Sequence, residues 1–96
     1  MSQDSKVDKV WYVYIARCAD DTLYTGISTD VDRRIQRHNS GRGAKYTRTR
    51  KPVKLEAHAQ VGTLSEALSV ERRIKKLKRD EKIPFVKKLL ARDDKS

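Results

Sequence analysis

Two short runs of β-branched and aromatic residues, joined by a turn-forming stretch, constrain this chain most. Residues 11–17 (WYVYIAR) and 23–28 (LYTGIS) have strand-like composition, and CADDT between them supplies turn residues. This pattern predicts a β-hairpin. Because successive strand side chains point to opposite faces, Val13 and Ile15 are expected together on one face. The other face is expected to carry Tyr12, Tyr14, Tyr24 and Gly26.

The helical segment that follows has an unusual inward face. The spacing of Val31 and Ile35 predicts a helix over residues 30–39. The same inward stripe contains Arg34 and His38, a cation and an imidazole where core side chains are expected. Burying an unpaired charge is costly, so both need a partner or a function. We expect the two apolar residues to anchor the helix while the two polar ones face the open edge of a cleft.

The rest of the chain predicts a third strand and two more helices. A basic loop is expected before Pro52. A helix is expected over residues 63–79, and its inward stripe contains Glu71. Pro84 suits the first turn of a short final helix. The third strand, over residues 53–61, alternates without a break, so one face is expected to hold Val53, Leu55, Ala57, Ala59 and Val61. The order β-β-α-β-α-α indicates an α/β (strictly α+β) fold, a small three-stranded sheet flanked by helices.

The length of 96 residues fits one domain. We expect it over residues 10–90, with a flexible tail over residues 1–9 and a frayed C-terminus over residues 91–96. The sequence has no apolar run long enough to span a membrane and no signal-peptide core. Its single cysteine excludes a disulfide framework. These features favour a cytoplasmic protein that does not bind membranes.

The charge distribution predicts a polyanionic partner. The net charge is +10, and residues 33–54 contain nine Lys or Arg residues and no Asp or Glu. Such a segment attracts nucleic acid through its phosphates. The expected nucleic-acid-binding residues are Arg33, Arg37, Arg42, Lys45, Tyr46, Arg48, Arg50 and Lys51.

Three charged or polar residues in predicted inward stripes need a joint explanation. Taken singly, Glu71 could pair with Arg34, and His38 could be a satisfied buried histidine. Together with a tyrosine-rich strand face, they match the needs of phosphodiester hydrolysis. A carboxylate can hold Mg²⁺ or Mn²⁺, an arginine can stabilise the phosphoryl oxygens, and a tyrosine or histidine can accept a proton from water.

The spacing of these residues resembles the GIY-YIG nuclease superfamily. The resemblance rests on YVY at residues 12–14, YTG at residues 24–26, and the later Arg34, His38 and Glu71. It is closest to the small stand-alone bacterial members that are grouped as an uncharacterised protein family. Each tripeptide is a weak signal alone, and the spacing to the three later residues makes the match specific.

The resemblance implies roles for the residues of the two tripeptides. Tyr14 matches the tyrosine proposed in the family as general base, and Tyr24 matches the tyrosine that lines the same site. Gly26 matches the motif glycine, which is expected to let the backbone or a phosphate approach closely.

The resemblance also implies the phosphate and metal contacts. Arg34 matches the arginine that contacts the scissile phosphate, and His38 matches a histidine found in many members. Glu71 matches the glutamate that binds a single Mg²⁺ or Mn²⁺ ion. The implied activity is a metal-dependent endonuclease that acts on nucleic acid, expected to be DNA, without a small-molecule organic cofactor.

Two other functions stay open. Tyr12 replaces the first motif glycine and Thr25 replaces the second motif isoleucine, which disturbs the assignment little. No asparagine follows Lys82 where several family nucleases have one, which favours a nucleic-acid-binding module without catalysis. The acid-free segment over residues 33–54 favours a basic, RNA-associated protein with no active site, in which Tyr46 stacks on a base.

Overall fold

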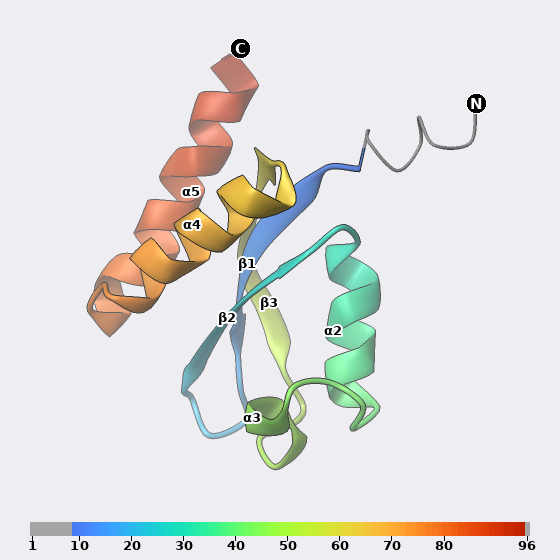
Figure 1. The fold of residues 1–96 in the computed structure, drawn as a ribbon. Helices are drawn as coiled ribbons and strands as arrows, with labels where there is room; N and C mark the ends of the chain where they lie inside the picture. Colours follow the sequence, from blue (N-terminus) through green and yellow to red (C-terminus); the bar gives the residue numbers. More distant parts are fainter. Residues whose placement is uncertain (1–8, 96) are drawn as a thin grey trace, which may run out of the picture.

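The strands form one antiparallel sheet in the order β2-β1-β3 (Figure 1). The structure, a computed structural model, describes residues 9–95. The tail expected over residues 1–9 therefore lies outside the described residues, apart from Lys9. The elements are β1 (Trp11–Arg17), β2 (Leu23–Ser28), α2 (Val31–Asn39), α3 (Lys45–Arg48), β3 (Lys54–Gly62), α4 (Leu64–Lys75) and α5 (Arg79–Lys95). The α+β fold predicted from the sequence is confirmed.

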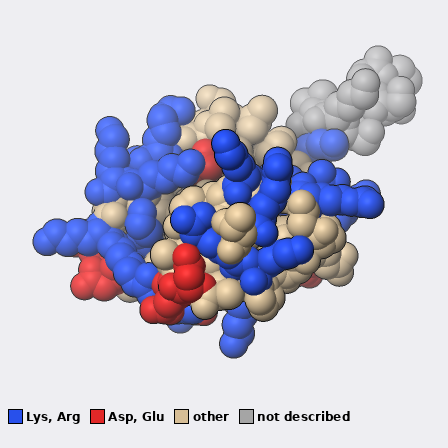
Figure 2. Space-filling model, turned by 90° about the horizontal axis from the view of Figure 1, so that it is seen from below, with Lys and Arg blue, Asp and Glu red and all other residues tan. Residues whose placement is uncertain are grey.

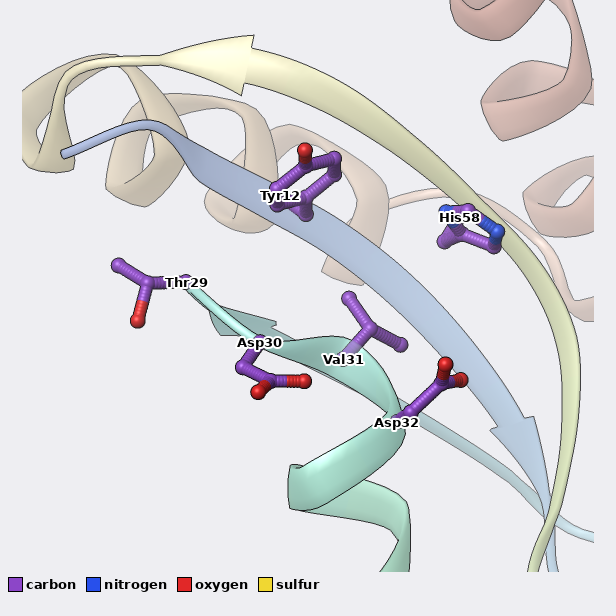
Figure 3. Close-up of a pocket in the computed structure, with 6 residues that line it drawn as sticks. All are labelled: Tyr12, Thr29, Asp30, Val31, Asp32 and His58. Carbon is purple, nitrogen blue, oxygen red and sulfur yellow. The ribbon is translucent and has the colours of Figure 1, made fainter.

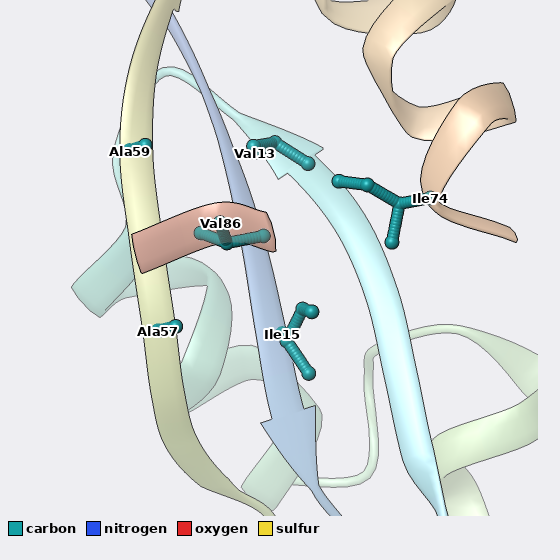
Figure 4. Packing of buried hydrophobic residues seen from close by; sticks show 6 residues of the cluster. All are labelled: Val13, Ile15, Ala57, Ala59, Ile74 and Val86. Carbon is teal, nitrogen blue, oxygen red and sulfur yellow. The ribbon is translucent and has the colours of Figure 1, made fainter. Parts of the chain in front are cut away.

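Helices cover both faces of the sheet. Helices α4 and α5 pack on one face, and α2 lies on the other (Figure 1). On the α4–α5 face, Val13 and Ile15 of β1 are fully buried, and they pack with side chains from β3 and both helices (Figure 4). The members of this core are Val13, Ile15, Ala57, Ala59, Ile74 and Val86. Val13 and Ile15 therefore lie on the opposite face of the sheet from Tyr12, Tyr14 and Tyr24, as predicted.

The opposite face has a smaller core around Tyr14. Val31 is buried there and Ile35 packs against the same cluster, so both residues anchor α2 as predicted. Other members of this cluster are Ala16, Cys18 and Val53, with Tyr12, Tyr24 and Leu55 at its margin. The motif tyrosines thus belong to the face that α2 covers.

A β-bulge makes the predicted alternation of β3 wrong at its start. Ile15 pairs with Ala57, but the next residue of β1, Ala16, pairs with Leu55, so the register shifts around Glu56. The Glu56 carboxylate accepts a hydrogen bond from Nε of Arg17 at 2.8 Å. Because an extra residue reverses the facing of the strand, Leu55 and the preceding Val53 join the α2 face instead of the α4–α5 core.

The helix boundaries also differ from prediction in three places. The basic segment before Pro52 is not all loop, because it contains the short helix α3. Helix α4 ends at Lys75, four residues before the predicted end at residue 79. Helix α5 begins at Arg79, where the Glu81 carboxylate accepts a hydrogen bond from the Lys78 amide.

Pro84 consequently lies inside α5 rather than in its first turn, and α5 continues through residues 91–95.

Among the helices that the structure describes, none combines the length and apolar character that crossing a membrane requires.

Candidate active site

Tyr14 lies at the centre of the candidate site, and Gly26 makes room for it. The two residues are cross-strand partners in β1 and β2, and the Tyr14 side chain is fully buried. A Cβ atom added at Gly26 would lie 2.6 Å from the Tyr14 hydroxyl oxygen and 2.7 Å from Cζ. Glycine at this position therefore leaves room for the Tyr14 ring. The resemblance instead predicts close approach of the backbone or of a phosphate.

The Tyr14 hydroxyl belongs to a buried chain of hydrogen bonds. It lies 2.7 Å from Nε2 of His38, and Nδ1 of the same imidazole lies 2.8 Å from Oγ1 of Thr47. Thr47 donates its single hydroxyl proton to the carbonyl oxygen of Ala44. The Thr47 oxygen must then accept from Nδ1, so neutral His38 has its proton on Nδ1 and accepts the Tyr14 proton at Nε2.

The His38 side chain does not lie where the sequence predicted. Its side chain is fully buried instead of facing the open edge of a cleft. Helix α2 turns it toward β1, and Gly43 packs so closely that an added Cβ would meet the imidazole and the His38 Cα. The imidazole can be buried because Thr47 of α3 and Tyr14 satisfy both of its ring nitrogens.

The electrostatics of this pair favour uncharged groups. Burial raises the pKa of Tyr14 to about 12, with a further contribution from Tyr24 and a small one from Glu71, while the nearby Arg34 guanidinium opposes the rise. Burial and the Arg34 charge lower the pKa of His38. At neutral pH the site therefore contains a protonated phenol that donates to a neutral imidazole.

Arg34 and Tyr24 flank this pair. Arg34 is half-buried on α2, and its positive charge lowers the pKa of His38 and opposes the rise in the pKa of Tyr14. The Tyr24 ring meets the His38 ring edge-on, with centroids 5.2 Å apart, and lies 6.2 Å from the Tyr14 ring. Four of the five predicted catalytic residues thus gather on one face of the sheet.

The fifth predicted residue, Glu71, comes from α4, which packs against β2 from the other face. Its side chain is 17% exposed, and its Oε2 lies 3.4 Å from Nζ of Lys75. Within the described residues, its ion pair is with Lys75, not with Arg34 as one alternative expected. The carboxylate is near enough to Tyr14 to influence the pKa of the phenol.

A metal ion would find only one carboxylate here. Within the described part of the chain, no three His, Cys, Asp or Glu side chains cluster as a metal site. Mg²⁺ often keeps several waters and uses one carboxylate together with substrate phosphate oxygens. Glu71 fits that limited role, and a metal ion would compete with Lys75 for its Oε2 atom.

The predicted nucleic-acid-binding residues separate into groups. Arg33, Arg37 and Arg42 line a shallow hollow on α2 and the loop after it. Lys45, Arg48 and Lys51 are exposed on or near α3. Lys and Arg side chains cover much of the face seen from below, the end of the molecule that carries α3 (Figure 2).

Arg50 has a mainly structural environment. Its guanidinium lies 3.9 Å from the centre of the Tyr46 ring and donates to the Tyr46 carbonyl oxygen. Its Nε also donates to the Asp20 carboxylate at 3.1 Å. Arg50 therefore holds Tyr46 in position and has less freedom than its neighbours to contact a phosphate.

A separate hollow lies near the start of α2, away from the Tyr14–His38 hydrogen bond. It has a volume of about 250 Å³, and its lining includes Tyr12, His58, Asp30 and Asp32 (Figure 3). Asp30 already accepts a hydrogen bond from the Arg33 amide as the N-cap of α2. The carboxylates make this hollow a poor match for nucleic acid.

Sequence reasoning missed two residues that shape the site. Thr47 orients His38 from a segment expected to be loop, and Gly43 allows the imidazole to pack closely. The one asparagine of the chain, Asn39, is structural, because its side chain both donates to and accepts from the Val53 backbone. No local pattern signals the Thr47 contact, since it depends on how α3 folds back on α2.

Comparison with known proteins identifies the family. The profile of the GIY-YIG catalytic domain matches residues 10–84. The chain belongs to the GIY-YIG family. A UPF0213 protein of Cupriavidus necator is 48% identical over 84 residues, covering 88% of this chain and 91% of the relative. A UPF0213 protein of Haloquadratum walsbyi is 54% identical over 71 residues, covering 74% and 80%.

Two solved structures of similar chains agree with the fold. The solution NMR structure of protein EF2693 from E. faecalis is 41% identical, with a TM-score of 0.58 over 83% of this chain and 85% of the other. The NMR structure of a UPF0213 protein from Bacillus halodurans is 47% identical, with a TM-score of 0.50 over 81% and 83%. Membership in this family indicates a nuclease-type domain, and the names of these relatives state no activity.

Proposed function

We propose that the protein is an endonuclease that hydrolyses phosphodiester bonds in DNA, with one Mg²⁺ or Mn²⁺ ion held by Glu71. The observation that carries this proposal is the buried hydrogen bond from Tyr14 to neutral His38, with the charge of Arg34 beside it. A phenol that donates to a neutral imidazole, with an arginine charge acting on both groups, is suited to proton transfer near a phosphate.

Tyr14 and His38 would act together on the attacking water. An isolated phenolate is disfavoured, since the pKa of Tyr14 is raised to about 12. In a concerted relay, the phenol oxygen would accept a proton from the attacking water as its own proton passes to Nε2 of His38, so that no free phenolate forms. The Nδ1 bond to Thr47 keeps Nε2 directed at Tyr14 throughout.

Arg34, and a divalent ion that Glu71 would hold, would supply the positive charge that stabilises the phosphate. The Arg34 guanidinium stabilises negative charge on the phosphoryl oxygens and on the Tyr14 oxygen. A divalent ion, when bound, adds positive charge at the same phosphate. Since Tyr14 is fully buried, substrate binding must displace a covering group, and the phosphate would draw the half-buried Arg34 guanidinium outward.

A nucleic-acid-binding module without catalysis is the second candidate. Two observations favour it: the Lys75 ammonium already pairs with the Glu71 carboxylate, and the Tyr14 hydroxyl is inaccessible to solvent. This candidate predicts salt-dependent binding without turnover.

Cleavage assays with a matched pair of glutamate variants separate these candidates. Branched, flapped, nicked and single-stranded DNA, together with RNA of the same sequences, are incubated with Mn²⁺ and with the wild type, Glu71→Gln or Glu66→Gln. Both substitutions remove one negative charge from α4, and a glutamine side chain in Glu66→Gln can keep the capping box with Thr63. The proposal expects loss of cleavage only in Glu71→Gln. Equal cleavage by all three proteins, or none by the wild type, would refute it.

A further inference from the structure

A groove runs along the outer edge of β2, directly beside the candidate active site. It has a volume of about 330 Å³ and is lined by Leu23, Tyr24, Thr25, Tyr46, Lys75 and Lys82. Its lining residues come from the edge strand β2, from α3, and from α4 and α5. Two of its residues also touch the site, since Tyr24 packs on His38 and Lys75 pairs with Glu71.

One wall of the groove is aromatic and held in place. The Tyr24 and Tyr46 rings are stacked, with centroids 6.0 Å apart and planes inclined by 30°. Tyr46 is 39% exposed, one of the few large exposed apolar side chains among the described residues. The Arg50 guanidinium covers the Tyr46 ring and is itself tied to Asp20. A planar base that stacks on Tyr46 would take the place of the Arg50 guanidinium over the ring.

The other wall is cationic. Nζ of Lys82 donates to the Ile74 carbonyl oxygen at 2.8 Å, which fixes the ammonium beside the end of α4. Burial lowers the pKa of Lys82, and the positive charge of Lys75 lowers it further. Because both lysines line the groove, their positive charges favour an anion beside this wall. A planar wall opposite a cationic wall matches a nucleotide, with its base on the tyrosines and its phosphate on the lysines.

We infer that this groove binds one unpaired nucleotide next to the scissile phosphate, an inference that rests on the proposed function. A volume near 330 Å³ suits a base and its sugar but not a base pair. A base in a duplex keeps its faces stacked on its neighbours, so it must leave the helix before it can stack on protein. The preferred substrate is therefore DNA that is single-stranded, flapped or gapped at the site of cleavage.

The inference is tested by binding, without cleavage. The Glu71→Gln protein, in EDTA, is titrated into a single-stranded oligonucleotide that carries 2-aminopurine, and into the matched duplex. Fluorescence reports stacking of the base, and anisotropy gives the Kd. We expect tighter binding to the single strand, with a change in 2-aminopurine fluorescence. Tyr46→Ala, on the same background, should weaken single-strand binding about five- to tenfold and leave duplex binding unchanged.

Tyr46→Phe provides the control, because it keeps the ring and should restore single-strand binding. Circular dichroism of each variant checks that the fold is kept. Equal loss on single strand and duplex in Tyr46→Ala, or no preference for the single strand, would overturn the inference. Since the assay reads binding by a protein that lacks Glu71, its result is independent of whether the wild type cleaves DNA.

Discussion

The substitution Gly26→Ala tests whether the motif glycine exists to seat Tyr14. The added methyl group would lie 2.6 Å from the hydroxyl oxygen and 2.7 Å from Cζ, where ordinary contacts begin near 3.4 Å. The ring must retreat by almost an ångström. Its hydrogen bond to Nε2 of His38, 2.7 Å long, would then exceed the length at which such bonds are stable.

The cost has three parts. Overpacking a core costs about 1–3 kcal/mol, and two buried polar groups left without partners cost about 1–3 kcal/mol more. Replacing a strand glycine with alanine returns about 0.5–1 kcal/mol. The free energy of unfolding of Gly26→Ala should therefore fall by about 1–5 kcal/mol, as measured by urea denaturation followed by circular dichroism.

A double-mutant cycle assigns this cost to the tyrosine ring. Tyr14→Leu removes Cζ and the hydroxyl group, which are the atoms that the new methyl would meet. In that background Gly26→Ala should cost nothing or stabilise slightly. If Gly26→Ala costs the same with tyrosine and with leucine at position 14, the glycine serves another purpose and the reasoning is wrong.

Three further predictions follow from the charges of the site. Lys75→Met removes the ammonium that lies 3.4 Å from Oε2 of Glu71, so the Mn²⁺ concentration for half-maximal cleavage should fall about two- to fivefold. The control Lys87→Met should leave that concentration unchanged. A higher Mn²⁺ concentration for half-maximal cleavage by Lys75→Met would contradict the metal role of Glu71. Folding lowers the pKa of His38, so its contribution to stability is complete above about pH 6.5 and is lost as the pH falls through the folded pKa. Urea denaturation between pH 5 and 6.5 (roughly the imidazole range) should show this slope in the wild type but not in His38→Gln. Folding raises the pKa of Tyr14 to about 12, so stability should be lost as the pH rises from 10 toward that value, and Tyr14→Phe should flatten the curve.

The hairpin and α2 could be predicted because their signals are local. Alternation fixes which side chains of β1 share a face, and a helical stripe fixes which face of α2 turns inward. Val13, Ile15 and Val31 accordingly occupy the predicted faces. The charged positions Arg34 and Glu71 stood out for the same reason, as exceptions in regular patterns.

The bulge in β3 and the burial of His38 could not be predicted, because both depend on distant contacts. The register shift lies next to the hydrogen bond between Arg17 and Glu56, which are far apart in the sequence. His38 is buried only because Thr47 and Tyr14 complete its hydrogen bonds. A single histidine in a helical stripe gives no information about either partner.

Single-turnover cleavage by Tyr14→Phe tests the central claim most directly. The substitution removes one hydroxyl oxygen and keeps the ring that fills the α2 face. With single-stranded or flapped DNA and Mn²⁺, the cleavage rate should fall at least about 100-fold, while the Kd for the same DNA stays within about twofold of the wild-type value. A Tyr14→Phe protein that folds normally and cleaves as fast as the wild type would show that the buried Tyr14–His38 hydrogen bond has no part in catalysis.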